Sequence, residues 1–280
     1  SATRSRTCRA GWSPSIPRDA FGSADGRFAW CPPMERLVRG NWLRWLVPTA
    51  ILNARFEKTL PRHDTGSRVA MPWSFGGDRI LVIAHRGASS EAPENTAAAV
   101  RLAFARRADL VELDVQLTRD RRVVIFHDER LERTSTGRGR LDRWRYRELR
   151  RLDVGSWFSP RFAGERLLLV SQAVKMCPPS RGVNLELKGT SQAAMLVRRL
   201  VSCLRQTRGQ QRVLISSFDT EMLARLRKAA PGVARAVLCA RRPWQALRQA
   251  VALECAALHP HHSITTRSLI QQAHRHGLRV

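Results

Sequence analysis

The chain has 280 residues, of which 43% are hydrophobic, enough to form the core of one large domain or two ordinary ones. Its 17 Gly, 14 Pro and 6 Cys are too few for a collagen-like, low-complexity or disulfide-scaffold protein. The formal net charge of +26 favours encounters with anions but does not identify a reaction. The arginines interleave with apolar residues, as on solvated helix faces, so no specific nucleic-acid partner is expected and nucleic-acid binding stays a minor alternative.

The cysteines form no C-x-x-C pair and no cluster with histidine at the spacing of a zinc site. This distribution predicts reduced thiols, no structural zinc and a cytoplasmic location. The most apolar N-terminal stretch, Trp42 to Leu52, contains Arg44 and Pro48, so it falls short of the roughly 18 apolar residues of a membrane span. We therefore expect neither a membrane span nor a signal peptide.

Residues 1–70 are rich in Ser, Arg, Pro and Trp and show no sustained period of a helix or a strand. We treat them as an extension of unassigned structure, with disorder as one explanation. Met71 stands just before the pattern becomes regular. The folded domain is therefore expected over residues 71–280.

From Ile80 onward, short apolar runs alternate with helical stretches, which predicts a parallel sheet covered by helices. The predicted strands are Ile80–Ala84, Leu110–Val115, Val123–Phe126, Val183–Leu187, Val213–Ser216, Ala236–Cys239, Ala256–Leu258 and Leu278–Val280. The predicted helices include Thr96–Arg107, Thr220–Ala229 and Thr266–His276, the last followed by Gly277 at its C-terminal end. This number of strands suits a (β/α)8 TIM barrel, and a doubly wound open sheet is the competing architecture.

Carboxylates occur at alternate positions of one predicted strand. Glu112 and Asp114 share one face of that strand, and Glu186 and Lys188 repeat the spacing in another. Burying two carboxylates together raises one pKa strongly, so a bound cation or a facing Arg or Lys is expected. The alternative is that these acids pair with the many arginines on a solvated edge, and for either pair alone that alternative is the more common one.

Histidines directly follow two predicted strands: His85 follows Ile80–Ala84, and His127 follows Val123–Phe126. The C-terminal ends of parallel strands build the sites of barrels, so these side chains and the acids are expected at one mouth. Three carboxylates suit a hard cation, Mg²⁺ or Ca²⁺, better than a soft one. Asn95 could serve this site or cap a helix.

Several segments, in order along the chain, resemble those of the glycerophosphodiester phosphodiesterases, whose barrel is like that of phosphatidylinositol-specific phospholipase C. They are Ala84-His85-Arg86-Gly87, Pro93-Glu94-Asn95-Thr96, Glu112-Leu113-Asp114-Val115, His127-Asp128, Arg133-Thr134, Leu185-Glu186-Leu187-Lys188 and Ser216-Ser217-Phe218. The resemblance covers about Ile80 to the C-terminus. It implies a (β/α)8 barrel that hydrolyses small glycerophosphodiesters to glycerol 3-phosphate and an alcohol, in lipid and glycerol metabolism.

The resemblance also implies roles for particular residues, carried over position by position. One divalent metal ion, Mg²⁺ or Ca²⁺, would be held by Glu112, Asp114 and Glu186. The acid and base would be His85 and His127, in an order that the sequence leaves open. The phosphate would be bound by Arg86 and Lys188. This chemistry agrees with the needs of a phosphodiester, whose cleavage requires charge neutralisation and two proton transfers.

The chain departs from the pattern of the family in three places. The turn between the second and third predicted strands is Asp120-Arg121-Arg122 and lacks the usual glycine, so we expect it to adopt another form. Ser171 is the only evident cap for the helix after Leu168. The family's later segments are not found before Val280, so we expect a barrel that lacks its closing C-terminal segment.

Other functions stay open at the level of the sequence. One alternative enzyme is a phospholipase D-like relative such as the sphingomyelinase D group. The others are a catalytically inactive barrel and a basic nucleic-acid-binding protein. The alcohol part of the substrate and the oligomeric state are not predicted.

Overall fold

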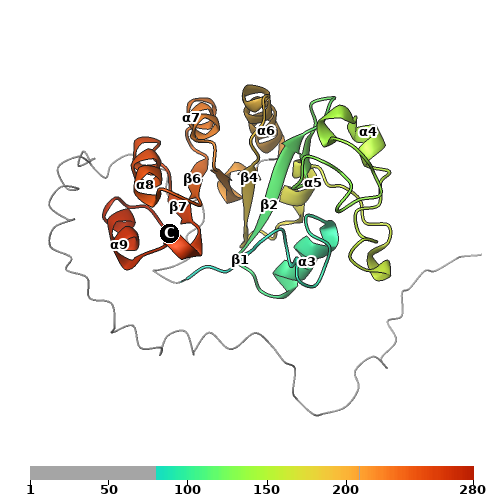
Figure 1. Ribbon diagram of the computed structural model, residues 1–280, viewed down its shortest axis with the longest axis horizontal. Coiled ribbons are helices and arrows are strands. Elements are labelled where there is room, and N and C mark those ends of the chain that lie inside the picture. The colour runs from blue at the N-terminus through green and yellow to red at the C-terminus, as the bar shows by residue number, and fades with distance from the viewer. Residues whose placement is uncertain (1–79, 208) are drawn as a thin grey trace, which may run out of the picture. The chain divides into compact units, whose positions relative to one another are not determined.

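The computed structural model describes residues 80–207 and 209–280, in which a twisted sheet is covered by helices (Figure 1). The predicted boundary between residues 70 and 71 lies outside this part of the chain. Strands of the sheet follow the order β1-β2-β4-β5-β6-β7, and β3 pairs with β2 off this path. Their bounds are β1 Ile83–Ala84, β2 Leu110–Leu117, β3 Val123–Ile125, β4 Gly182–Leu187, β5 Val213–Ser217, β6 Ala234–Cys239 and β7 Ala257–Pro260.

The helices follow the strands in a repeating order along the chain, and α6, α7, α8 and α9 succeed one another around the outside of the sheet (Figure 1). The α-helices are α3 Ala97–Ala105, α4 Tyr146–Leu149, α5 Val170–Met176, α6 Ala193–Thr207, α7 Thr220–Ala229, α8 Pro243–Ala252 and α9 Arg267–Arg275. Short 3₁₀ turns are η3 Leu141–Arg143, η4 Pro160–Phe162, η5 Gln210–Arg212 and η6 His262–Ile264. None of the helices in the described part is long and apolar enough to span a bilayer.

The order of the parallel strands distinguishes between the two predicted architectures. A doubly wound sheet reverses its strand order at a switch point. Here each parallel strand pairs with the next parallel strand along the chain. That sequential order, with helices outside, is the order of a (β/α)8 barrel and confirms the predicted fold class. In residues 80–207 and 209–280 the sheet does not close, because β1 does not pair with the opposite edge. At that edge, Arg279 forms a parallel bridge with Ala257 of β7.

The run Val123–Phe126 was expected as one of the parallel strands, and this expectation is wrong. β3 pairs antiparallel with β2, with Ile125 opposite Val115, so the two strands form a hairpin. The antiparallel direction brings the end of β3 back along β2, where the Phe126 N–H donates to the Asp114 carbonyl at 2.9 Å. His127 therefore reaches the acidic strand by a reversal of the chain and not by sharing its direction.

Local details correct three further expectations. The hairpin turn keeps a left-handed residue without glycine, because Arg121 itself has φ +61°. Ser171 does not cap α5, whose N-cap is Leu169 with the Gln172 side chain accepting from the Leu169 N–H at 2.8 Å. The expected last strand is reduced to the Arg279 bridge: Leu278 is 1% exposed, but Val280 is 44% exposed.

A separate apolar cluster supports the long segment that follows β3. Its buried members come from β3 and from the loops and short helices up to α5: Val124, Phe126, Leu131, Leu141, Leu149, Val154 and Leu167. Burial of such side chains stabilises a loop that would otherwise be mobile. The segment carrying His127, Asp128 and Arg133 is thereby anchored beside the sheet.

Candidate active site

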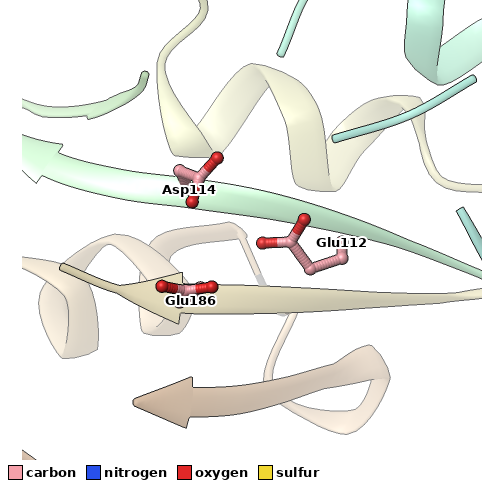
Figure 2. Close-up of side chains that lie close together, drawn as sticks. All are labelled: Glu112, Asp114 and Glu186. Atoms are coloured by element: carbon pink, nitrogen blue, oxygen red, sulfur yellow. The ribbon is translucent and has the colours of Figure 1, made fainter. Parts of the chain in front are cut away.

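Three buried carboxylates from neighbouring strands form the centre of the site. Glu112 and Asp114 lie on β2, Glu186 lies on β4, and the register pairs Asp114 with Glu186. One oxygen from each lies within 4.8 Å of the others. Figure 2 shows the three side chains on the same face of the two strands. They are 6%, 0% and 9% exposed, so the alternative of a solvated edge is excluded.

Two basic side chains face these carboxylates. The Lys188 ammonium donates to Glu186 Oε1 at 2.8 Å and lies 3.3 Å from Asp114 Oδ1. Burial alone would lower the pKa of Lys188, but the bond to Glu186 and the charge of Asp114 outweigh burial and raise it. Arg86 Nε lies 3.4 Å from Asp114 Oδ2. The structure thus brings both predicted phosphate-binding residues to the acidic centre.

Charge among these five side chains does not balance. Three carboxylates face two cations, and burial together with the charge of Asp114 raises the pKa of Glu112 to about 8. The buried atoms Glu112 Oε1 and Asp114 Oδ1 have no hydrogen-bond donor. Buried carboxylate oxygens that lack hydrogen bonds and carry surplus negative charge are costly unless a proton or a cation joins them. The donor set therefore fits a hard divalent ion.

The loop after β1 sets the positions of His85 and Arg86. Arg86 has φ +58°, and this left-handed turn directs its N–H to Glu112 Oε2 at 2.9 Å. His85 Nε2 lies 3.9 Å from the same oxygen. Partial burial, followed by the charge of Arg86, lowers the pKa of His85. The neighbouring Gly87, at φ +83°, has no room for a side chain, because an added Cβ would lie 2.6 Å from the Cβ of Ala99.

Asn95 serves the site and not the helix end. Its side-chain amide donates to Asp114 Oδ2 at 2.8 Å, and its oxygen accepts from the Asp114 N–H at 3.3 Å. The N-cap of α3 is Thr96, whose hydroxyl accepts from the Ala99 N–H at 3.2 Å. Asn95 is thus a fixed partner of the central carboxylate.

His127 lies in the segment after β3, beside a carboxylate of its own. Its Nδ1 lies 2.5 Å from Asp128 Oδ1, and its side chain is 29% exposed. The Gln116 amide, on the same face of β2 as Glu112 and Asp114, reaches the carbonyls of Phe126, His127 and Asp128 at 3.0, 3.0 and 2.7 Å. Gln116 received no role from the sequence, although its alternate position after Asp114 was a usable signal.

Sequence reasoning also gave no role to Glu94, Asp128 or Arg133, which the structure joins into an ion-pair network at the rim of the site. Arg133 lies 2.5 Å from Asp128 and 2.7 Å from Glu94. Glu94 in turn accepts from Arg86 at 3.1 Å. These residues stood in recognised segments, but the ion pairs between segments depend on tertiary structure.

Comparisons with known proteins agree with this geometry. The sequence model of the "Glycerophosphoryl diester phosphodiesterase family" matches residues 85–280. The chain belongs to this family. A glycerophosphodiester phosphodiesterase from Caldanaerobacter subterraneus subsp. tengcongensis is 34% identical over 207 residues, covering 72% of this chain and 84% of that relative. A Bacillus subtilis (strain 168) relative is 39% identical over 159 residues, covering 57% of this chain and 65% of that protein, just under two thirds of its length.

A solved structure gives the same assignment. An Oleispira antarctica phosphodiesterase, solved in complex with the product sn-glycerol-3-phosphate, is 33% identical, with a TM-score of 0.67 over 71% of this chain and 82% of that one. The predicted family and barrel fold are confirmed, and the family is one of phosphoric diester hydrolases.

Proposed function

We propose that this protein hydrolyses glycerophosphodiesters to glycerol 3-phosphate and an alcohol with one bound divalent cation, Mg²⁺ or Ca²⁺. The observation that carries the proposal is the buried group Glu112, Asp114 and Glu186, with Arg86 and Lys188 against it. The glycerol 3-phosphate bound by the Oleispira relative supports the substrate class. Small anionic diesters also suit a chain of net charge +26.

The cation would be held by Glu112, Asp114 and Glu186. Bound there, it would neutralise charge on the phosphate and make the phosphorus more electrophilic. Two buried oxygens without a hydrogen bond, Glu112 Oε1 and Asp114 Oδ1, favour this ligand set, although Asp114 Oδ1 also lies 3.3 Å from the Lys188 ammonium. Asn95 keeps Asp114 oriented by two hydrogen bonds, at 2.8 and 3.3 Å.

Arg86 and Lys188 would bind the phosphate oxygens. Both cations already contact the carboxylates, so they are held in place before substrate arrives and little reorganisation accompanies its binding. Negative charge grows on the phosphate oxygens as the attacking group approaches. Fixed cations at that position stabilise the transition state more than the ground state.

His85 and His127 would carry the two proton transfers. One removes a proton from the attacking oxygen, and the other donates a proton to the leaving alcohol oxygen. His85 Nε2 lies 3.9 Å from Glu112, beside the ion-binding carboxylates, and His127 is held by Asp128 on the segment after β3.

The setting proposed for this reaction is lipid and glycerol metabolism in the cytoplasm. Free thiols support that location: in the described part of the chain Cys177, Cys203, Cys239 and Cys255 are unpaired. Measuring the distribution of a tagged full-length chain between cell fractions tests it.

Release of glycerol 3-phosphate from glycerophosphocholine, measured with Mg²⁺, with Ca²⁺ and with excess chelator, tests the proposed reaction. We expect chelator to abolish the activity and Glu112→Gln to lower kcat about 10²-fold, because an electrostatic partner of the transition state is lost. Calorimetric titration with the metal should show weaker binding for Glu112→Gln. The control is Glu221→Gln, which changes a carboxylate that is 71% exposed on α7. Full activity in excess chelator would contradict the proposal.

A further inference from the structure

Arg133 holds two carboxylates at once, although nothing in the proposed reaction uses it. Its Nε and Nη2 donate to the two oxygens of Asp128, at 2.5 and 3.0 Å. Its Nη1 and Nη2 donate to the two oxygens of Glu94, at 3.0 and 2.7 Å. Each carboxylate is therefore bound in the two-pronged manner that a planar guanidinium allows.

The first of these carboxylates contacts His127. Asp128 Oδ1 lies 2.5 Å from His127 Nδ1. Hydrogen bonds from Arg133, with the bond from His127, lower the pKa of Asp128 to about 2, so the group is ionised near neutral pH. An ionised carboxylate only accepts, which means that Nδ1 of His127 is the donor and carries a proton. The other ring nitrogen, Nε2, is left for proton transfer.

The second carboxylate contacts Arg86. Glu94 Oε1 accepts from Arg86 Nη1 at 3.1 Å as well as from Arg133. The bonds from Arg133, then the charge of Arg86, lower the pKa of Glu94 despite its burial. Arg86 also lies 3.4 Å from Asp114, so its guanidinium is held between the rim network and the acidic centre.

We infer that Arg133 is a positioning residue of the proposed diesterase site. Through Asp128 it holds the ring of His127, and through Glu94 it holds the guanidinium of Arg86. It thereby fixes a proton-transfer group on the segment after β3 relative to a phosphate-binding group on the loop after β1. This inference rests on the proposed function for the roles of those two residues.

The geometry indicates a role in orientation more than in stability. The Arg133 side chain is 45% exposed, and exposed ion pairs contribute little to the free energy of unfolding. The His127 ring is 29% exposed, so a ring that lost its ordered partner could rotate. A misplacement of about 1 Å in a reacting group can cost about 10²-fold in rate.

Arg133→Lys is the variant that tests the inference. Lysine keeps the charge but cannot donate in pairs to two carboxylates. We expect kcat to fall about 10²-fold, with little change in melting temperature. The matched control is Arg130→Lys, three residues earlier, because Arg130 is 64% exposed and pairs with Glu132 at 2.7 Å. That control should keep the kcat of the wild type.

A double-mutant cycle shows whether Arg133 acts through His127. If it does, Arg133→Lys should cost much less in a His127→Ala background than in the wild type, because the group that it orients is gone. Equal fold losses of kcat in both backgrounds would overturn the inference. A large fall in melting temperature that accounts for the lost activity would also overturn it.

A measurement without catalysis separates this inference from the proposed function. The ¹⁵N chemical shifts of His127, assigned by their loss in His127→Ala, should report a protonated Nδ1 in the neutral ring of the wild type. Arg133→Lys should give a mixture of the two tautomers, and an unchanged tautomer would contradict the inference. If the wild type released no glycerol 3-phosphate with any of the metals, the proposed function would be refuted. The tautomer of His127 in the wild type and in Arg133→Lys would still decide the role of Arg133.

Discussion

Asp128 is held in its ionised form by Arg133 and His127, which lower its pKa to about 2 from an ordinary value near 3.8. In the unfolded chain the carboxyl takes up a proton at a higher pH than in the fold. The ion pairs therefore contribute their full stability above the ordinary pKa and lose it as the pH falls toward 2.

Urea unfolding at several pH values tests this effect. The difference in the free energy of unfolding between the wild type and Asp128→Asn should shrink as the pH falls below about pH 4. A parallel series on Asp219→Asn serves as the comparison, because Asp219 caps α7 through the N–H groups of Glu221 and Met222. A difference for Asp128→Asn that stays constant down to pH 3 would contradict the assigned ion pair.

Part of the candidate site could be predicted from the positions of single residues in the sequence. Alternation along a strand placed Glu112 and Asp114 on one face, because the period of a strand is fixed by the backbone. The same rule extends to Gln116, whose amide holds the carbonyls at the end of β3. Ion pairs such as that of Arg133 with Glu94 join segments 39 residues apart, so no local pattern reveals them.

At the scale of the elements, the turn between β2 and β3 places an arginine in a conformation that favours glycine. Arg121 has φ +61°, which costs a residue with a side chain about 1–2 kcal/mol. The Thr118 hydroxyl compensates locally by accepting from the Arg122 N–H at 2.9 Å and donating to Asp120 at 2.6 Å. The left-handed residue is thus retained although the glycine is not.

Arg121→Gly should stabilise the protein. Relief of the strained φ exceeds the added entropy of glycine in the unfolded chain, which leaves a net gain of about 0.5–1 kcal/mol. Thermal melting should show a rise of about 2 °C for a domain of this size. At the neighbouring position, which is not left-handed, Arg122→Gly should lower the melting temperature. A lower melting temperature for Arg121→Gly would contradict the strain assigned to this position, since glycine keeps the Arg121 carbonyl that accepts from Arg199 at 3.0 Å.

The hairpin of β2 and β3 also shows where strand prediction from the sequence is limited. Apolar runs located Val123–Ile125 correctly, because a buried strand needs such residues. Their direction relative to β2 is set by the length of the turn between the two strands, because residues 118–122 are too few for a parallel crossover. The parallel direction was therefore an incorrect reason to expect His127 at the acidic centre, and the catalytic role of His127 stays a prediction.

At the scale of the whole molecule, the regular alternation of strands and helices specified the barrel order. Each parallel strand from β4 to β7 pairs with the parallel strand before it in the chain, β4 with β2 and so on, so the sheet is built step by step along the chain. The register then brings Glu186 opposite Asp114, and a site formed by separate strands follows from the sheet itself. What the sequence could not supply is the contact between the β3–α5 segment and the loop after β1.

The proposed domain boundary at Met71 can be tested by shortening the chain. The family match begins at residue 85, and the first strand of the sheet, β1, begins at Ile83. The Val82 N–H donates to Asp109 at 2.9 Å, so the sheet is anchored from about this point. A chain that begins at Met71 should therefore melt within about 2–4 °C of the full chain, a range that corresponds to roughly 1 kcal/mol for a domain of this size.

The matched control is a chain that begins at Ala88, which lacks β1 and the Arg86 N–H bond to Glu112. It should melt at a lower temperature and release no glycerol 3-phosphate, because it lacks His85 and Arg86. Both shortened chains are compared with the full chain by thermal melting, light scattering and the chelator-sensitive assay. Aggregation of the chain that begins at Met71, while the full chain melts cooperatively, would show that residues before Met71 belong to the fold.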